Sequence, residues 1–116
     1  MNHEEALQIY QDIRNGKYKM LRKAIKEHKD DEVDYYYVAQ LVVERNNILF
    51  LHWLAKHIGP LIILAQVDEL LQIAEKHCGN KQITSWLKRL HQVDDAERLE
   101  NIYKIWLNDP YFILPK

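Results

Sequence analysis

The sequence predicts an all-α fold, a compact bundle or stack of about six short helices arranged as helical hairpins. Only three glycines and three prolines occur in 116 residues, and 47% of the residues are hydrophobic. No run rich in Val, Ile or Thr alternates with polar residues between turn signals, as half-buried strands would require. A chain of this length forms one domain, covering residues 1–116.

Two helices are expected in the N-terminal part. Asn2 followed by Glu5 fits a capping box that opens the first helix, and Asn15-Gly16 closes it. From Lys17 to Lys29 the apolar residues fall on one stripe, with basic residues on the opposite side. This pattern predicts a second, amphipathic helix.

The middle of the chain is its most apolar part. The segment 33-VDYYYVAQLVVE-44 has apolar residues at nearly every angle of a helix, which predicts a helix central to the domain. Its β-branched and aromatic content leaves a strand possible there. Residues 48–58 form the next expected helix. Gly59-Pro60 ends it, and Pro60 can also serve as the first residue of the following segment.

Three further helices are expected towards the C-terminus. Residues 67–78 form a helix that stops at Gly79-Asn80, and 82–93 present one apolar face. Asp94 followed by Glu97 is a capping box that opens a last helix. The apolar tail 110–116 is expected to pack back on the body, because its apolar side chains would otherwise stand in water.

Charge and composition limit the partners and the compartment. Sixteen basic and seventeen acidic residues give a net charge of −1, which provides no global attraction to nucleic acid or anionic membranes. The apolar stretch 47–66 contains Lys56, and a lysine near the centre of a membrane span costs roughly 2.5–3.5 kcal/mol. The single cysteine, Cys78, cannot form an internal disulfide. We therefore expect a cytoplasmic protein without a membrane segment.

Part of the chain resembles a degenerate ankyrin-repeat protein. The segment 13-IRNGKYKMLRKAIKEHKDDEVDY-35 has the cadence of a first repeat, and 51-LHWLA-55 is similar to the family's leucine-histidine-x-alanine-alanine helix start. The segment 67-VDELLQIAEKHCGN-80 is similar to its second helix and closing glycine. Leu49-Phe50 stands where the family has threonine-proline, and the chain beyond residue 80 departs from the pattern. The resemblance implies a protein-binding module without catalytic residues.

The histidines and the cysteine do not have the spacing of a metal site on one helix. Ligand pairs usually stand at i and i+4, whereas His52 and His57 are five residues apart and point to different faces. We expect both to be structural. His77 and Cys78 are a poor bidentate pair, although distant ligands could join them in a metal site. Cys78 is expected at a helix C-terminus, where the dipole disfavours a reactive thiolate.

A basic run lies on the second expected helix. Lys19, Arg22, Lys23 and Lys26 share one face, which could follow the phosphates of a nucleic acid. The solvated outer face of an amphipathic helix would look the same, and Glu27 with the acidic residues at 30–34 dilutes the charge. We prefer the solvated face.

The sequence lacks the common motifs of enzymes and nucleotide-binding proteins. No Gly-rich phosphate loop, G-x-S-x-G or CxxC pattern occurs, so we expect no enzyme and no cofactor. The expected function is a small non-enzymatic protein–protein interaction module of the adaptor, inhibitor, immunity or effector type. Whether it forms a homodimer is left open by the sequence. The alternatives are a nucleic-acid-associated protein using the basic run and a metal-binding protein using His77 and Cys78. Aromatic side chains that stand exposed would be the anchors for a partner. The candidates are Tyr35, Tyr36, Trp53, Trp86, Trp106, Tyr111 and Phe112.

Overall fold

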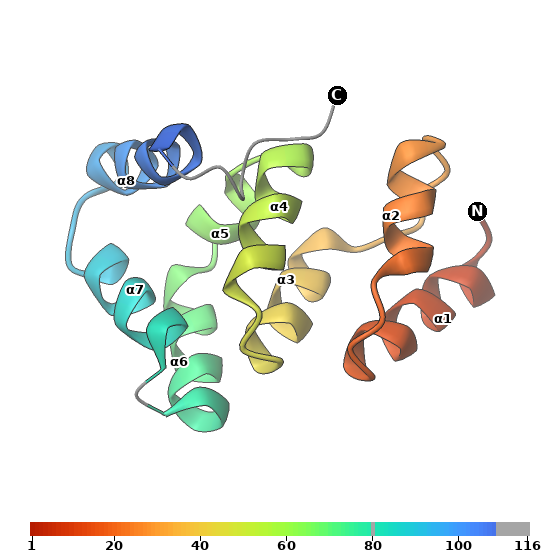
Figure 1. Cartoon of the computed structure of the whole chain (residues 1–116), viewed down its shortest axis with the longest axis horizontal. Coiled ribbons are helices and arrows are strands. Elements are labelled where there is room, and N and C mark those ends of the chain that lie inside the picture. The colour runs from red at the N-terminus through yellow and green to blue at the C-terminus, as the bar shows by residue number, and fades with distance from the viewer. Residues whose placement is uncertain (80, 109–116) are drawn as a thin grey trace.

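The computed structural model describes residues 1–79 and 81–108, with side chains up to residue 104, and is helical without any strand in this part of the chain. An all-α fold is thereby confirmed. The helices follow one another from one end of the molecule to the other (Figure 1). They are α1 (His3–Arg14), α2 (Lys19–Lys26), α3 (Tyr35–Glu44), α4 (Ile48–Ile58), α5 (Leu61–Leu64), α6 (Val67–Cys78), α7 (Gln82–His91) and α8 (Asp95–Asn108).

The expected number of about six helices was too low, since eight are described. The segment that left a strand possible forms helix α3. Pro60 precedes a separate single turn, α5, because its φ of −68° suits the start of a helix. At Gln66 the backbone leaves the helical region, with φ −144° and ψ 36°, so α5 and α6 are distinct helices.

Short polar side chains begin the helices where the sequence places them. The side chain of Asn2 accepts a hydrogen bond from the backbone N–H of Glu5 at 2.8 Å, and Asp94 accepts one from Glu97 at 2.9 Å. Asp34 and Asn47 cap α3 and α4 in the same way. These contacts satisfy backbone donors that have no partner within the first turn.

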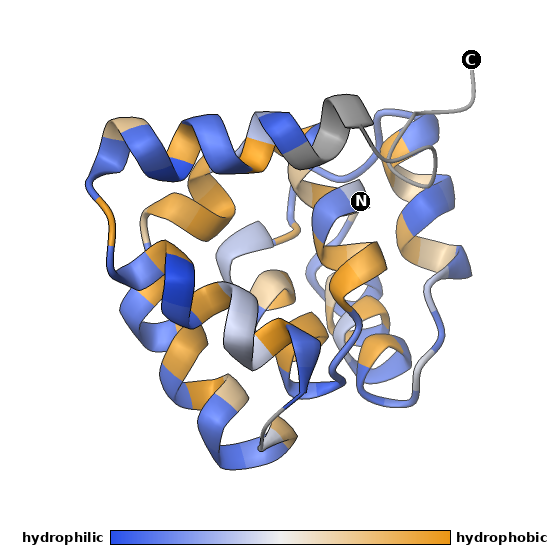
Figure 2. Ribbon diagram, turned by 60° about the vertical axis from the view of Figure 1, so that its left-hand side comes forward, coloured by the Kyte–Doolittle hydropathy of each residue, from blue (hydrophilic) through white to orange (hydrophobic). Residues whose placement is uncertain are grey.

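Helix α3 is the centre of the domain, as its all-round apolar pattern predicts. It contacts α1, α4, α5 and α6, and five of its residues are buried: Val38, Ala39, Leu41, Val42 and Val43. Apolar residues face the interior and polar ones the outside on most of the helices (Figure 2). Burial of this apolar surface is the main driving force for the fold.

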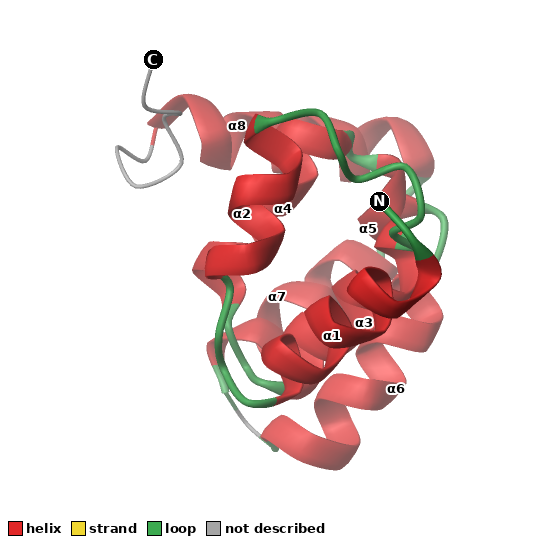
Figure 3. Ribbon diagram, turned by 90° about the vertical axis from the view of Figure 1, so that its right-hand side faces the viewer, coloured by secondary structure: helices red, strands yellow, loops and turns green. Residues whose placement is uncertain are grey.

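Two layers of helices result. In the first, α1 contacts α3 and α3 contacts α6. In the second, α2 reaches α4 through the stacked rings of Tyr18 and Phe50, and α4 reaches α7 through His52 and Trp86, whose ring centroids are 4.5 Å apart. Figure 3 shows α2 and α4 on one side of the molecule and α1, α3 and α6 on the other.

A buried glutamine joins the middle helices. Gln66 is 6% exposed, and its amide donates to the carbonyls of Tyr36 and Ile62 while its carbonyl accepts from Gln40. All three contacts lie between 2.7 and 2.9 Å. A buried amide is costly unless it is paired in this way, so this side chain fixes α5 against α3.

No helix among the described residues has the length and apolar character needed to cross a membrane. The expectation that tail 110–116 packs on the body concerns residues outside the described part of the chain.

Candidate functional site

Helix α2 presents a basic surface because its two sides differ in character. Leu21 and Ala24 are buried against the body. The residues predicted to share the opposite side are all exposed, which confirms that part of the prediction. They are Lys19, Arg22, Lys23 and Lys26.

Helix α4 places aromatic rings beside this basic side. The ring of Tyr18, just before α2, stacks on Phe50 with centroids 4.1 Å apart. Trp53 lies one turn after Phe50, with centroids at 5.2 Å, and His57 lies 4.1 Å from Trp53 in turn. The guanidinium of Arg22 lies 5.4 Å from the centre of the Phe50 ring and 5.1 Å from that of Trp53. Each such cation–π contact contributes about 0.5–1 kcal/mol at an exposed site.

Positive charge is concentrated where these two helices meet. Segments 17–26 and 47–58 contain six of the sixteen basic residues and none of the seventeen acidic ones. The rest of the chain therefore has ten basic residues against seventeen acidic ones. Partial burial, and then the charges of Lys56 and Arg22, hold the pKa of His57 below its ordinary value. A field of one sign at this surface favours an anionic partner.

We call this surface the α2–α4 face. It consists of Tyr18, Lys19, Arg22, Lys23, Lys26, Leu49, Trp53, Lys56 and His57. Phe50 is buried and packs against Tyr18, Arg22 and Trp53 from the core side.

An open groove adjoins the face where α1 passes into α2. Its volume is about 570 Å³ and its lining is largely apolar. We call it the Tyr18 groove. Its lining residues are Asp12, Lys17, Tyr18, Lys19, Met20 and Lys23. Lysine stems contribute apolar surface while their ammonium groups stay at the rim.

Half of this site could be read from the sequence and half could not. The basic side of α2 follows from helical periodicity alone. Its meeting with Trp53 and His57 depends on how α2 packs on α4, which periodicity does not determine. One sequence signal was overlooked, because the absence of acidic residues from both segments already separates them from the rest of the chain.

The expected aromatic anchors differ in their accessibility. Trp86 is 5% exposed and packs on His52, so it is not available as an anchor, contrary to its place among the candidates. The Tyr35 hydroxyl donates to Asp30, and burial followed by this contact raises the pKa of Tyr35. Tyr36 is 44% exposed, and Trp53 is half-buried on the α2–α4 face. The Trp106 side chain, Tyr111 and Phe112 lie outside the described residues.

His77 and Cys78 point in different directions. Cys78 is buried, and its Sγ donates to the backbone carbonyl of Val43 at 3.2 Å. Burial is the largest cause of the raised pKa of its thiol. His77 is exposed and lines a small cavity of about 310 Å³ with Arg14, Leu41, Glu44 and Arg45. Among the described residues, no group of three His, Cys, Asp or Glu side chains could hold a metal ion.

The arginines of that cavity have a structural role. Arg45 donates to the backbone carbonyl of Arg14 at 3.3 Å, at the C-terminal end of α1. A Cβ at Gly16, whose φ is +76°, would lie 2.6 Å from the Arg45 guanidinium. The Arg14 side chain donates to the Tyr37 hydroxyl. Both arginines therefore have partners within the protein and need no ligand.

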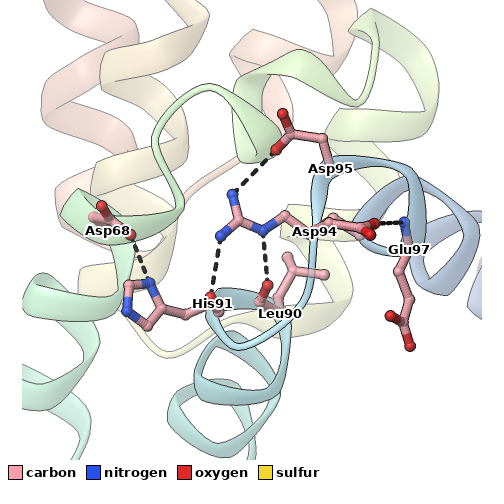
Figure 4. Close-up of polar contacts among 7 residues, drawn as sticks. Asp68, Leu90, His91, Asp94, Asp95 and Glu97 are labelled. Carbon is pink, nitrogen blue, oxygen red and sulfur yellow. Dashed lines mark hydrogen bonds and ion pairs between the residues drawn. The ribbon is translucent and has the colours of Figure 1, made fainter.

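A second polar cluster closes the C-terminal end of α7 (Figure 4). Arg98 donates to the carbonyls of Leu90 and His91, at 2.8 and 3.1 Å. The His91 ring lies 2.6 Å from the Asp68 carboxylate at the start of α6. These contacts satisfy carbonyls at a helix end and join α6, α7 and α8. The cluster is a cap.

No family model matches the chain, and no match is found among curated proteins or solved structures. The α2–α4 face, with its groove, is therefore identified by its chemistry alone.

Proposed function

We propose that this protein is a small non-enzymatic interaction module that binds an anionic partner protein through the α2–α4 face. The observation that carries the proposal is the packing of Arg22 on Phe50 and Trp53, at 5.4 and 5.1 Å, in a surface without acidic residues on either helix. Aromatic and arginine side chains dominate protein interfaces. A partner with acidic residues would contact the exposed Arg22 and the half-buried Trp53, while the buried Phe50 supports them from below.

We also propose that the helices form a stack of hairpins. The pairs α1–α2, α3–α4 and α6–α7 would act as stacked helical hairpins, in the manner of an ankyrin-like module. The two layers of contacts support this arrangement, in which a lateral surface of the stack receives the partner. A cytoplasmic location suits a chain with a single cysteine that is buried and unpaired.

Nucleic acid is the second candidate ligand, because the same four cations of α2 could contact phosphates. The rest of the chain has more acidic than basic residues. This negative charge would repel a long polyanion that extends beyond the α2–α4 face. Charge variants of the protein, compared before and after nuclease treatment, distinguish a protein partner from a nucleic acid.

The test is comparative capture from a cell extract. One bait is the wild-type protein, and the second has four α2 cations replaced: Lys19→Ser, Arg22→Gln, Lys23→Ser and Lys26→Ser. A matched control removes the same charge from exposed positions on and beside α6 and α7: Lys76→Ser, Lys81→Ser, Lys88→Ser and Arg89→Gln. All three baits are compared before and after nuclease treatment.

We expect a defined set of proteins to bind the wild type and the control and to be lost from the α2 variant, independently of nuclease. Equal retention by all three baits would contradict the proposed face. Loss of every bound protein after nuclease treatment would favour the nucleic-acid candidate.

A further inference from the structure

We propose that the Tyr18 groove receives one apolar side chain of the partner, and that the recognised segment is a peptide in which acidic residues flank this anchor. The inference rests on the proposed function and specifies the chemistry of the partner.

The volume and the apolar lining of the Tyr18 groove suit one apolar side chain. Its volume of about 570 Å³ lies within the range of sites that bury small ligands, roughly 300–1,000 Å³. Tyr18 and the half-buried Met20 contribute apolar surface. A methionine side chain adapts its shape to different apolar partners. An aliphatic or aromatic side chain is the group that gains most from such a lining.

Basic residues surround the Tyr18 groove and favour acidic residues on either side of the anchor. Lys17, Lys19 and Lys23 line it, and Arg22 and Lys26 continue the positive surface along α2. Partner groups that lie beside the anchor therefore meet ammonium ions. Carboxylates are the side chains that match them.

Asp12 gives the site a direction. It is the one acidic residue that lines the Tyr18 groove, and its carboxylate accepts a hydrogen bond from the Gln8 amide at 2.8 Å. It repels a carboxylate at the α1 side of the groove. The acidic residues of the partner are thereby directed towards α2.

The aromatic rings favour a peptide over a nucleic acid. Single-stranded nucleic acids bind by stacking successive bases on open aromatic faces. Here one face of Tyr18 lies against Phe50, and Trp53 is contacted by Phe50, His57 and Arg22. Few ring faces are therefore left on which bases could stack. The Tyr18 groove, by contrast, is open and can receive a single side chain.

The test uses the full chain and four labelled probes in fluorescence anisotropy. The first probe is a peptide with one leucine between glutamates. The second has serine for the leucine, the third has glutamine for the glutamates, and the fourth is a single-stranded oligonucleotide of the same charge as the first. The proteins are the wild type, Met20→Gln, Lys26→Ser, the four-charge α2 variant and its α6–α7 control.

The first peptide should bind the wild type most tightly, with the leucine worth about tenfold or more in affinity. That preference should shrink in Met20→Gln. Lys26→Ser, which changes an exposed residue outside the lining of the groove, should weaken both acidic peptides and keep the leucine preference.

Each other outcome has a distinct meaning. Equal binding of the leucine and serine peptides would overturn the apolar anchor and leave the proposed face in place. Equal binding of the neutral peptide would overturn the acidic flanks. Tighter binding of the oligonucleotide would assign the groove to nucleic acid. Acidic-peptide binding that survives the four-charge change would overturn the proposed function itself. Self-association that competes with the peptide would assign the groove to a second copy of the chain.

Discussion

The guanidinium of Arg22 lies 5.1 Å from the centre of the Trp53 ring, and this contact joins the basic side of α2 to the aromatic side of α4. Arg22 also adds positive charge near His57, whose imidazole lies 4.1 Å from Trp53 between ring centroids. Cation, indole and imidazole therefore form one electrostatic unit at the surface.

Removing the charge of Arg22 should raise the pKa of His57 towards its ordinary value. Arg22 disfavours the protonated imidazole, after burial and Lys56 as the larger causes. In Arg22→Gln we expect the NMR titration midpoint of His57 to move upward, while Lys88→Gln leaves it unchanged. A midpoint that stays in place or moves downward would show that Arg22 does not act on this ring.

Binding of an acidic peptide should become stronger as the pH falls through the range in which His57 takes up a proton in the complex. His57 has a lowered pKa in the free protein, so it is mostly neutral at pH 7. Carboxylates of the partner favour its protonated form and raise that pKa, so binding takes up a proton. Glutamates remain largely ionised down to pH 5.5.

Titrations at pH 5.5 and 7.5 measure this linkage. The pH dependence should be reduced in His57→Gln and retained in His91→Gln, since His91 lies at the α7 cap. An affinity that is the same at both pH values in the wild type would place the acidic residues of the peptide away from His57.

Arg98→Met should lower the free energy of unfolding by about 1–3 kcal/mol, because two carbonyls at the end of α7 lose charge-assisted hydrogen bonds. Urea denaturation followed by circular dichroism measures this loss. Arg89→Met is the matched control, since Arg89 is exposed on α7, the helix whose end Arg98 caps. If both variants unfold at the same urea concentration, the cap does not contribute to stability.

Cys78 should react slowly with thiol reagents in the folded protein. Its thiol is buried, donates to the Val43 carbonyl, and has a raised pKa, so little thiolate is present or accessible. Absorbance after addition of a disulfide reagent should rise only when urea unfolds the chain. Rapid reaction without urea would mean that α6 opens locally near its C-terminal end.

Local interactions explain which parts of the fold the sequence predicted. Asn2 and Asp94 begin helices through hydrogen bonds to residues three positions away, and such signals are visible in any short window. The all-round apolar pattern of residues 33–44 also lies within a short window, and it correctly predicted that α3 is central. Pro60 was recognised as a possible start. The single helical turn that follows it is tied to α3 by the contacts of Gln66 with Tyr36 and Gln40, which lie far away in the sequence and leave no local pattern.

The candidate site shows the opposite case. Trp53 and Trp86 are equivalent as residue types, and tertiary packing alone makes the first half-exposed and the second buried. Likewise, the sequence shows the four cations of α2 but not the rings that lie beside them. Only their combination distinguishes a binding face from an ordinary solvated helix.

Site-specific photo-crosslinking in cells tests the proposed face most directly. A photoreactive phenylalanine derivative would replace Leu49, which is 50% exposed and stands one turn before Trp53 on α4, or Leu7, which is also 50% exposed but lies on α1. We expect a discrete crosslinked protein from position 49 that disappears when the four α2 cations are removed, and none from position 7. The same crosslink from both positions, or from position 7 alone, would contradict binding through the α2–α4 face.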